Sequence, residues 1–319
     1  MPGMKRRDFL ATAATAATAP FVFSRTGRGQ AANQQAKLDR LAIMSLTFGS
    51  ILKNANQPDS ATRTLDIMDL GQMYADKYGV HNVELQHAYL PSTDDRWLKD
   101  FRARLEKSRS RVSNINCEFG GTMTISADTA VGRLQAIDLT KRWIDHAATL
   151  GCPRIMLNQG QLTDVNKAVA IATLKTMGEY GKSKGVMVSN EPRGGGGGGR
   201  RGAGAPAEAP APPPGPPPPP AYILLTEVIK ASGTYANVDV ANYGDQDVQQ
   251  AGIRAMMPYT VGNTHFRLNP ARYDLAAAVR IVRDEFKYQG IYLIEQGVPA
   301  GPDPYANIQE IRDFMLEHI

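Results

Sequence analysis

The 319-residue sequence has little of several features that define particular protein classes. Its two cysteines, Cys117 and Cys152, are too few for the several disulfides that hold small secreted scaffolds together. Beyond the N-terminal segment, it has no run of about 18 apolar residues, the length that a membrane-spanning helix needs. These absences exclude a disulfide-rich scaffold, and we expect no membrane span.

The sequence also lacks a basic folded body, although its net charge is +5. Residues 1–31 carry a net charge of +4, and residues 193–220 carry +2. Because these two segments together hold one positive charge more than the whole chain, the remainder carries −1. Nucleic-acid binding relies on a positive surface that neutralises phosphates. We therefore expect no nucleic-acid partner.

The first 31 residues have the order of an export signal. Arg6 and Arg7 precede Phe9 and Leu10, and a weakly apolar run rich in alanine and threonine follows. This order is typical of a signal peptide, and the arginine pair is typical of the twin-arginine type. We predict a twin-arginine-type signal peptide at 1–31 and export to the periplasm or beyond the cell. A disordered basic tail is the alternative.

A low-complexity segment interrupts the second half of the chain. Residues 193–220 hold 10 of the 21 prolines and 9 of the 30 glycines. Glycine tracts form flexible coils and proline tracts form extended rods, and neither buries apolar surface. We interpret this segment as a disordered insertion within a single domain that spans residues 38–319.

The rest of the sequence alternates short apolar runs with longer amphipathic segments. The predicted strands are Leu41–Thr47, Asn82–Gln86, Arg111–Cys117, Arg154–Leu157, Val186–Ser189, Ala236–Val240, Asn263–Phe266 and Gly290–Ile294. The predicted helices are Asp66–Tyr78, Asp94–Ser108, Ala127–Leu150, Asp164–Lys184, Tyr222–Ser232, Gln246–Met256, Leu275–Glu285 and Ile308–His318. Eight such units predict an α/β fold, the (β/α)8 TIM barrel, with the insertion after strand five. A doubly wound sheet is disfavoured because no Gly-x-Gly-x-x-Gly follows the first strand.

Chemically active residues lie at or beside the ends of the last four predicted strands. Glu191 follows the fifth, Asp239 lies in the sixth, His265 lies near the end of the seventh and Glu295 follows the eighth. The C-terminal strand ends form the catalytic face of a TIM barrel. Buried carboxylates there need a cation or another partner, and this donor set suits a hard-to-borderline divalent ion. Each residue alone could be a cap, a core histidine or half of an ion pair, but the four in register predict a metal site.

With these residues the sequence resembles the xylose isomerase-like TIM barrels, a group of sugar phosphate isomerases and epimerases. The resemblance covers about residues 38–319. It rests on Glu191, Asp239 to Asn242, His265-Phe266-Arg267 and Glu295 to Gly297. The group often has lysine where this sequence has Arg267. The resemblance implies one divalent metal ion, held by Glu191, Asp239, His265 and Glu295. Manganese is expected, with magnesium, cobalt or zinc as alternatives.

The resemblance also implies that Glu191 and Glu295 act as acid and base on opposite faces of a sugar. A metal ion that chelates the carbonyl and its neighbouring hydroxyl stabilises an enediolate, while one carboxylate removes the adjacent proton and the other returns it. The expected function is a metal-dependent sugar isomerase or epimerase. The alternatives are a lyase or dehydratase acting on a keto-sugar or keto-glycoside, and a non-catalytic sugar-binding barrel.

Other polar residues near strand ends are candidates for binding a carbohydrate substrate. They are Glu84 and His87 after the second strand, Asn158 after the fourth and Arg267 after the seventh. For each of them a structural or solvated role is the alternative.

Overall fold

The computed structural model describes residues 25–53, 60–120, 122–192, 219–243, 245–296 and 303–319. The chain forms two compact units, Met1–Ala36 and Lys37–Ile319. Helix α1 (Arg25–Leu38) supplies the described residues of the first unit. The arginine pair of the predicted signal peptide and residues 193–218 of the predicted insertion lie outside the described residues.

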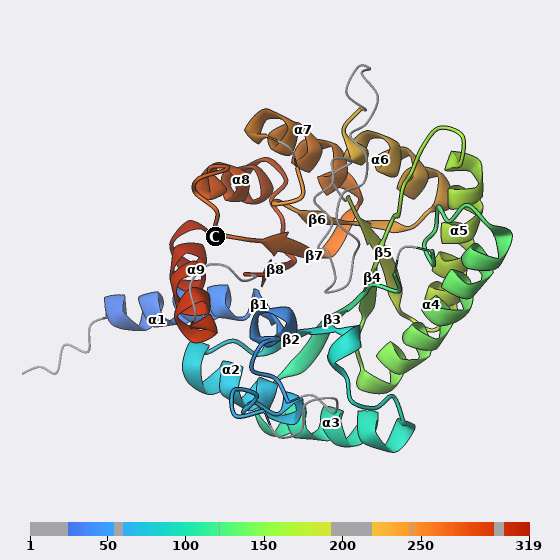
Figure 1. The fold of residues 1–319 in the computed structure, drawn as a ribbon. Helices are drawn as coiled ribbons and strands as arrows, with labels where there is room; N and C mark the ends of the chain where they lie inside the picture. Colours follow the sequence, from blue (N-terminus) through green and yellow to red (C-terminus); the bar gives the residue numbers. More distant parts are fainter. Residues whose placement is uncertain (1–24, 54–59, 121, 193–218, 244, 297–302) are drawn as a thin grey trace, which may run out of the picture. The chain divides into compact units, whose positions relative to one another are not determined.

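The second unit contains a closed barrel of eight parallel strands (Figure 1). Neighbouring strands pair in chain order, and β8 closes onto β1. The strands are β1 (Leu41–Met44), β2 (Asn82–Gln86), β3 (Arg111–Cys117), β4 (Arg154–Asn158), β5 (Met187–Glu191), β6 (Tyr235–Asp239), β7 (Thr260–Phe266) and β8 (Ile291–Ile294). This confirms the (β/α)8 TIM barrel predicted from the sequence.

Helices form an outer ring around these strands (Figure 1). They are α2 (Leu70–Tyr78), α3 (Asp95–Lys107), α4 (Ala130–Leu150), α5 (Lys167–Ser183), α6 (Ala221–Ser232), α7 (Gln246–Met256), α8 (Leu275–Arg280) and α9 (Pro304–His318). Because β5 ends at Glu191 and α6 begins at Ala221, the low-complexity segment follows strand five, as predicted.

Most predicted elements differ from the observed ones by a few residues at one or both ends, and two of them also differ in kind. The first strand was expected to reach Thr47, but it stops at Met44 and the 3-10 helix η1 (Ser45–Phe48) follows. The Oγ of Ser45 accepts a hydrogen bond from the backbone N–H of Gln86 at 2.8 Å, which ties this turn to the end of β2. The predicted helix ending at Glu285 changes after Arg280 into the π-helical turn η5 (Ile281–Glu285).

Strand alternation separates an apolar layer from a polar barrel interior. In β2, Val83 and Leu85 belong to the large apolar core of the unit, and Glu84 between them is fully buried among polar side chains. Successive side chains of a strand point to opposite faces of the sheet. The outward face of each strand therefore packs under the helices, and the inward face is free to carry polar groups.

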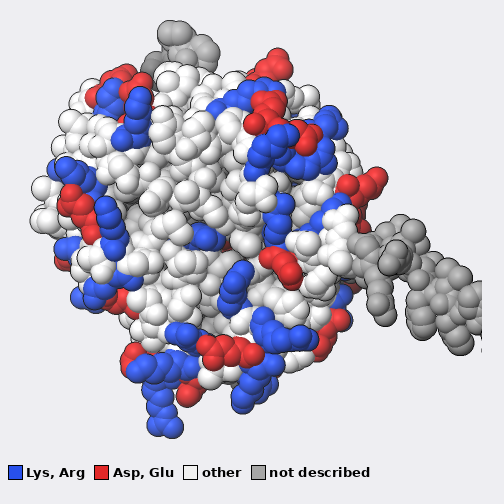
Figure 2. Space-filling view, turned by 180° about the vertical axis from the view of Figure 1, so that it is seen from behind, with Lys and Arg blue, Asp and Glu red and all other residues white. Residues whose placement is uncertain are grey.

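The outer surface carries charges of both signs. Figure 2 shows basic and acidic side chains interspersed around one face of the molecule, with uncharged residues between them. This agrees with the net charge near zero that the sequence assigns to the folded body. Among the described residues, no helix combines the length and the apolar character needed to cross a membrane.

Gly181 lies where α5 packs closely on β5, the strand that carries Glu191. A Cβ atom at Gly181 would lie 2.5 Å from the carbonyl oxygen of Val186 and 2.8 Å from a methyl carbon of Val188. Overpacking costs about 1–3 kcal/mol, and alanine regains roughly 1 kcal/mol as a better helix former. Because the closest contact is with a backbone oxygen, which cannot easily move, the cost lies at the upper end of this range, and we expect Gly181→Ala to lower the free energy of unfolding by about 2 kcal/mol in chemical denaturation.

The matched control is Thr176→Ala, on the exposed side of the same helix. Surface substitutions of this kind change stability by about 0.5 kcal/mol or less. A Gly181→Ala variant as stable as this control would contradict the close packing of α5 on β5.

Candidate metal centre

Four side chains meet at the C-terminal ends of β5 to β8. Glu191, Asp239, His265 and Glu295 each offer one ligand atom, and these atoms all lie within 4.8 Å of one another. All four residues are buried, and Glu295, the most exposed of them, has 4% of its surface accessible. The structure thus brings together the four residues that the sequence pattern selects.

The register of the strands explains this convergence. Asp239 on β6 is the pairing partner of His265 on β7, and His265 in turn pairs with Leu293 on β8. Glu295 follows Leu293 by two residues, so its side chain returns to the same face of the barrel. The backbone N–H of Glu295 donates to the carbonyl of Phe266 at 3.0 Å, which extends the β7–β8 ladder to this residue.

Arg267 links two of the proposed ligands. Its guanidinium lies 2.5 Å from Oδ2 of Asp239 and 2.9 Å from Oε2 of Glu295. The backbone of Arg267 is held as well, because the hydroxyl of Tyr273 donates to its carbonyl at 2.7 Å. Burial lowers the pKa of Arg267, but the Asp239 and Glu295 carboxylates outweigh burial and raise it. Arg267 is therefore a fixed cation at the edge of the group.

His265 lies between carboxylates on both sides of its ring. Its Nδ1 is 2.9 Å from Oε2 of Glu295 and 3.6 Å from Oε2 of Glu191, and its Nε2 is 3.1 Å from Oε1 of Glu84. Burial lowers the pKa of His265, but Glu84 and Glu295 outweigh burial and raise it well above its ordinary value. Both ring nitrogens of His265 thus lie close to carboxylate oxygens.

The charge and chemistry of this group fit a divalent cation. Three carboxyl groups of the site and that of Glu84 surround His265, and the guanidinium of Arg267 pairs with two of them. Burying charge without compensation costs several kcal/mol per ion. Three carboxylate oxygens and one imidazole nitrogen are ligands that manganese and similar ions accept. Glu191, Asp239, His265 and Glu295 would hold such an ion.

Glu84 lies inside the barrel and has no surface accessible to solvent. Its Oε2 accepts hydrogen bonds from the side-chain amides of Asn114 and Asn263, each at 2.9 Å. Its other oxygen faces His265. Substrate binding by Glu84 stays a prediction, and in this structure both of its carboxylate oxygens face groups of the protein.

His87 is packed into the neighbouring part of the same barrel end. It begins the 3-10 helix η3 (His87–Tyr89), and its Nδ1 accepts a hydrogen bond from the backbone N–H of Glu118 at 3.3 Å. Its ring contacts Phe119 and Trp143 edge-on. Burial lowers the pKa of His87, although Glu118 opposes this. His87 is thus held as a neutral acceptor, and its contact with substrate stays a prediction.

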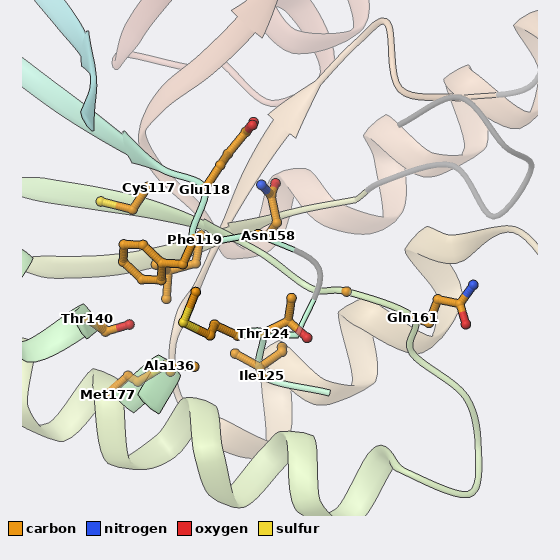
Figure 3. Close-up of a pocket in the computed structure, with 14 residues that line it drawn as sticks. Cys117, Glu118, Phe119, Thr124, Ile125, Ala136, Thr140, Asn158, Gln161 and Met177 are labelled. Atoms are coloured by element: carbon orange, nitrogen blue, oxygen red, sulfur yellow. The ribbon is translucent and has the colours of Figure 1, made fainter. Parts of the chain in front are cut away.

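Asn158 connects the group of carboxylates with a neighbouring pocket. It ends β4, where it pairs in register with Glu191. It also lines a pocket of about 320 Å³ together with Glu118. The rest of the lining is mostly apolar and includes Phe119, Met123, Ile125, Ala136 and Met177. Figure 3 shows Glu118 and Asn158 on one side of this pocket and Thr140, Ala136 and Met177, from α4 and α5, on the other.

Three buried asparagines of the site were missed in the sequence. They are Asn114 on β3, Asn237 on β6 and Asn263 on β7. Asn237 precedes Asp239 by two residues, and Asn263 precedes His265 by two. Residues two apart share a strand face, so this spacing could have identified Asn237 and Asn263 as neighbours of the candidate metal ligands.

Structural comparison gives clear matches, while no family model and no curated protein sequence matches this chain. An L-ribulose 3-epimerase superimposes with a TM-score of 0.64 at 14% identity, over 88% of this chain and 95% of that one. The 3-keto-D-glucoside 4-epimerase of E. coli gives 0.58 at 12% identity, over 88% and 100%. A xylose isomerase-like TIM barrel protein from Mycobacterium smegmatis, in complex with magnesium, gives 0.59 at 16% identity, over 88% and 97%.

These likenesses identify the fold. It is that of the xylose isomerase-like TIM barrels, the group that the sequence resembles. Sugar epimerases are among the proteins that share it. At such identities the comparison concerns architecture, and the chemistry must be argued from the side chains of this chain.

The candidate metal centre predicts that manganese stabilises the protein. A ligand present at 100 times its dissociation constant stabilises the folded state by about 2.7 kcal/mol, so Mn²⁺ should raise the Tm of metal-depleted protein. Asp239→Asn removes one proposed ligand. We expect it to weaken Mn²⁺ binding by more than about 100-fold in calorimetric titration, since even partners of ligands are worth about 10–100-fold.

Asp247→Asn is the control, because this carboxylate is exposed on α7, outside the group. It should bind Mn²⁺ like the wild type. Unaltered Mn²⁺ affinity in Asp239→Asn would rule out Asp239 as a ligand.

Proposed function

We propose that this protein is a divalent metal-dependent sugar isomerase or epimerase, with Mn²⁺ as the metal ion and an unphosphorylated sugar as substrate. The observation that carries the proposal is the buried group of Glu191, Asp239, His265 and Glu295, which combines a metal donor set with two glutamates able to transfer protons. The epimerases that share the fold support the class of reaction.

The positions of the two glutamates suit proton exchange at a carbon next to a carbonyl. Glu191 ends β5 and Glu295 follows β8, so two other strands of the barrel lie between them. They can therefore approach one substrate from different directions, as removal and return of a proton require. A bound metal ion would stabilise the negative charge that develops on the carbonyl oxygen.

Arg267 has a separate task in this proposal. Its side chain is 24% exposed while its guanidinium contacts both Asp239 and Glu295. It can thus hold Glu295 in place and present donor groups to a substrate oxygen. Asn158, which pairs in register with Glu191 at the end of β4, would contact substrate hydroxyls.

Export through the twin-arginine pathway belongs to the same proposal. Its support is the order of residues 1–31, with Arg6 and Arg7 ahead of a weakly apolar run. Twin-arginine export carries folded proteins, which suits an enzyme that acquires its metal ion before it leaves the cytoplasm.

The acid–base role of Glu295 can be tested by solvent-deuterium exchange. The substitution Glu295→Gln keeps the shape of the side chain but removes its ability to take up a proton. Positioned acid–base groups contribute about 10²–10⁴-fold, so we expect deuterium incorporation at C2 or C3 of a responsive sugar to fall by at least about 100-fold. Mass spectrometry of a panel of free sugars and 3-keto sugars with Mn²⁺ measures this.

The control for this test is Glu285→Gln. Glu285 is exposed and pairs with Arg254 on the outer surface. The Glu285→Gln variant should exchange deuterium at the wild-type rate. Exchange that persists undiminished in Glu295→Gln would remove Glu295 from the reaction.

A second candidate function is a lyase acting on a keto-glycoside, and the pocket beside Asn158 favours it. Its mostly apolar lining and its volume of about 320 Å³ suit an apolar aglycone better than sugar hydroxyls. In this reaction a glutamate removes the C2 proton of a 3-keto-glycoside, and the C1–O bond breaks. The aglycone leaves with the electron pair and takes up a proton, and a C1=C2 double bond forms.

A nitrophenyl 3-keto-glucoside distinguishes the two functions. A lyase releases nitrophenol, which is read by absorbance, whereas an epimerase only exchanges deuterium. Ala136→Leu would fill part of the pocket. If the lyase function holds, this variant should raise KM for the nitrophenyl substrate and leave exchange with free 3-keto-glucose unchanged. No release of nitrophenol, or an unchanged KM, would contradict the lyase function.

A further inference from the structure

Glu84 and His265 form a buried contact across the barrel interior. Nε2 of His265 lies 3.1 Å from Oε1 of Glu84, and both side chains are completely buried. Among the described residues neither of these atoms makes a hydrogen bond of regular geometry, so each is a buried polar atom whose close neighbour is the other. The opposite nitrogen of the ring, Nδ1, faces Glu191 and Glu295. The two nitrogens of His265 thus point to two different groups of carboxylates.

We propose that Glu84 is a positioning residue that sets the tautomer and the orientation of His265. Its Oε1 accepts the Nε2 proton of the imidazole, so that Nδ1 is the nitrogen left with a lone pair for the metal ion. This role rests on the proposed metal centre and adds to it a residue that would not touch the metal. Partners of ligating histidines commonly act in this way, fixing the ring and raising its basicity.

Glu84 is itself held from the side opposite to His265. Its Oε2 accepts hydrogen bonds from Asn114 Nδ2 on β3 and from Asn263 Nδ2 on β7, each at 2.9 Å. Asn263 also donates to Oδ1 of Asn237 on β6, at 3.2 Å. The Glu84 carboxylate is therefore connected to β3, β6 and β7 through these asparagines. This fixes the direction in which its other oxygen, Oε1, faces His265.

The contacts on the two sides of Glu84 fit a carboxylate. The two amide donors need an acceptor at one oxygen, and a proton on Nε2 needs an acceptor at the other. An ionised carboxylate accepts at both oxygens, whereas a glutamine has one acceptor and one donor. In Glu84→Gln, the NH₂ group of the glutamine can face the amide donors of Asn114 and Asn263, which gives no hydrogen bond. Alternatively, it can face Nε2 of His265. In the latter arrangement Nε2 becomes the acceptor and the proton moves to Nδ1, where it blocks the metal ion.

The test compares Glu84→Gln with Asn114→Leu in the full-length protein. Asn114→Leu disturbs the same buried network by removing one donor to Oε2, but leaves Oε1 available to His265. We expect Glu84→Gln to weaken Mn²⁺ binding by about 10- to 100-fold in calorimetric titration. Asn114→Leu should lower the Tm and bind Mn²⁺ within a few-fold of the wild type. A purely structural role of Glu84 predicts that Mn²⁺ affinity follows the loss of Tm in both variants, and that result would overturn the proposal.

A measurement on the wild type avoids dependence on the folding of any variant. In Zn²⁺-loaded protein, long-range ¹H–¹⁵N correlation spectra distinguish a protonated ring nitrogen from a metal-bound one, and His265→Asn assigns the resonance. We expect His265 to carry its proton on Nε2. A proton on Nδ1, with the metal on Nε2, would overturn the role of Glu84 while leaving a metal centre in place. Failure of the wild type to bind Mn²⁺ or Zn²⁺ would instead remove the metal centre, and this role with it.

Discussion

The structure of the site depends on the compensation of negative charge inside the barrel. Four carboxylates are buried around His265 and beside Arg267, and none of these four acidic residues has more than 4% of its surface accessible. Charges in such surroundings are costly unless each has a partner of opposite sign or several hydrogen bonds. The contacts of Arg267, of His265 and of the interior amides all answer this requirement. So does the affinity for a divalent cation that we propose.

The TIM barrel makes this concentration of charge possible because it separates the apolar layer between strands and helices from the space inside the strands. The apolar residues that stabilise the fold lie mainly between the strands and the helices, as Val83 and Leu85 do on β2. The inward faces of the strands contribute less to that apolar layer and can carry polar groups. A small apolar cluster of Ala42, Met44 and Leu293 lies apart from the large core. Polar side chains fill much of the remaining interior toward the C-terminal end.

Two surroundings meet at the end of β4, and together they define the chemistry that the site can perform. Asn158 lies beside Glu191 of the charged group and also lines a mostly apolar pocket. A substrate that uses both would carry a polar, chelating part and an apolar part. Two solved structures of the same fold are named as sugar epimerases, and under the proposed function the pocket beside Asn158 would favour a sugar that carries an apolar substituent.

The sequence by itself determined the barrel and the four residues of the candidate metal centre. Both follow from local patterns: strand–helix alternation fixes the fold, and a polar residue at the end of an apolar run marks the catalytic face. The sequence did not reveal the partner of His265. Glu84 lies on β2, whereas His265 and Asn263 lie on β7. Glu84 and its hydrogen-bond partner Asn263 are 179 residues apart in the sequence. Only closure of the barrel and the stagger of its strands bring such residues into contact, because side-chain distances across the interior depend on all the strands between them.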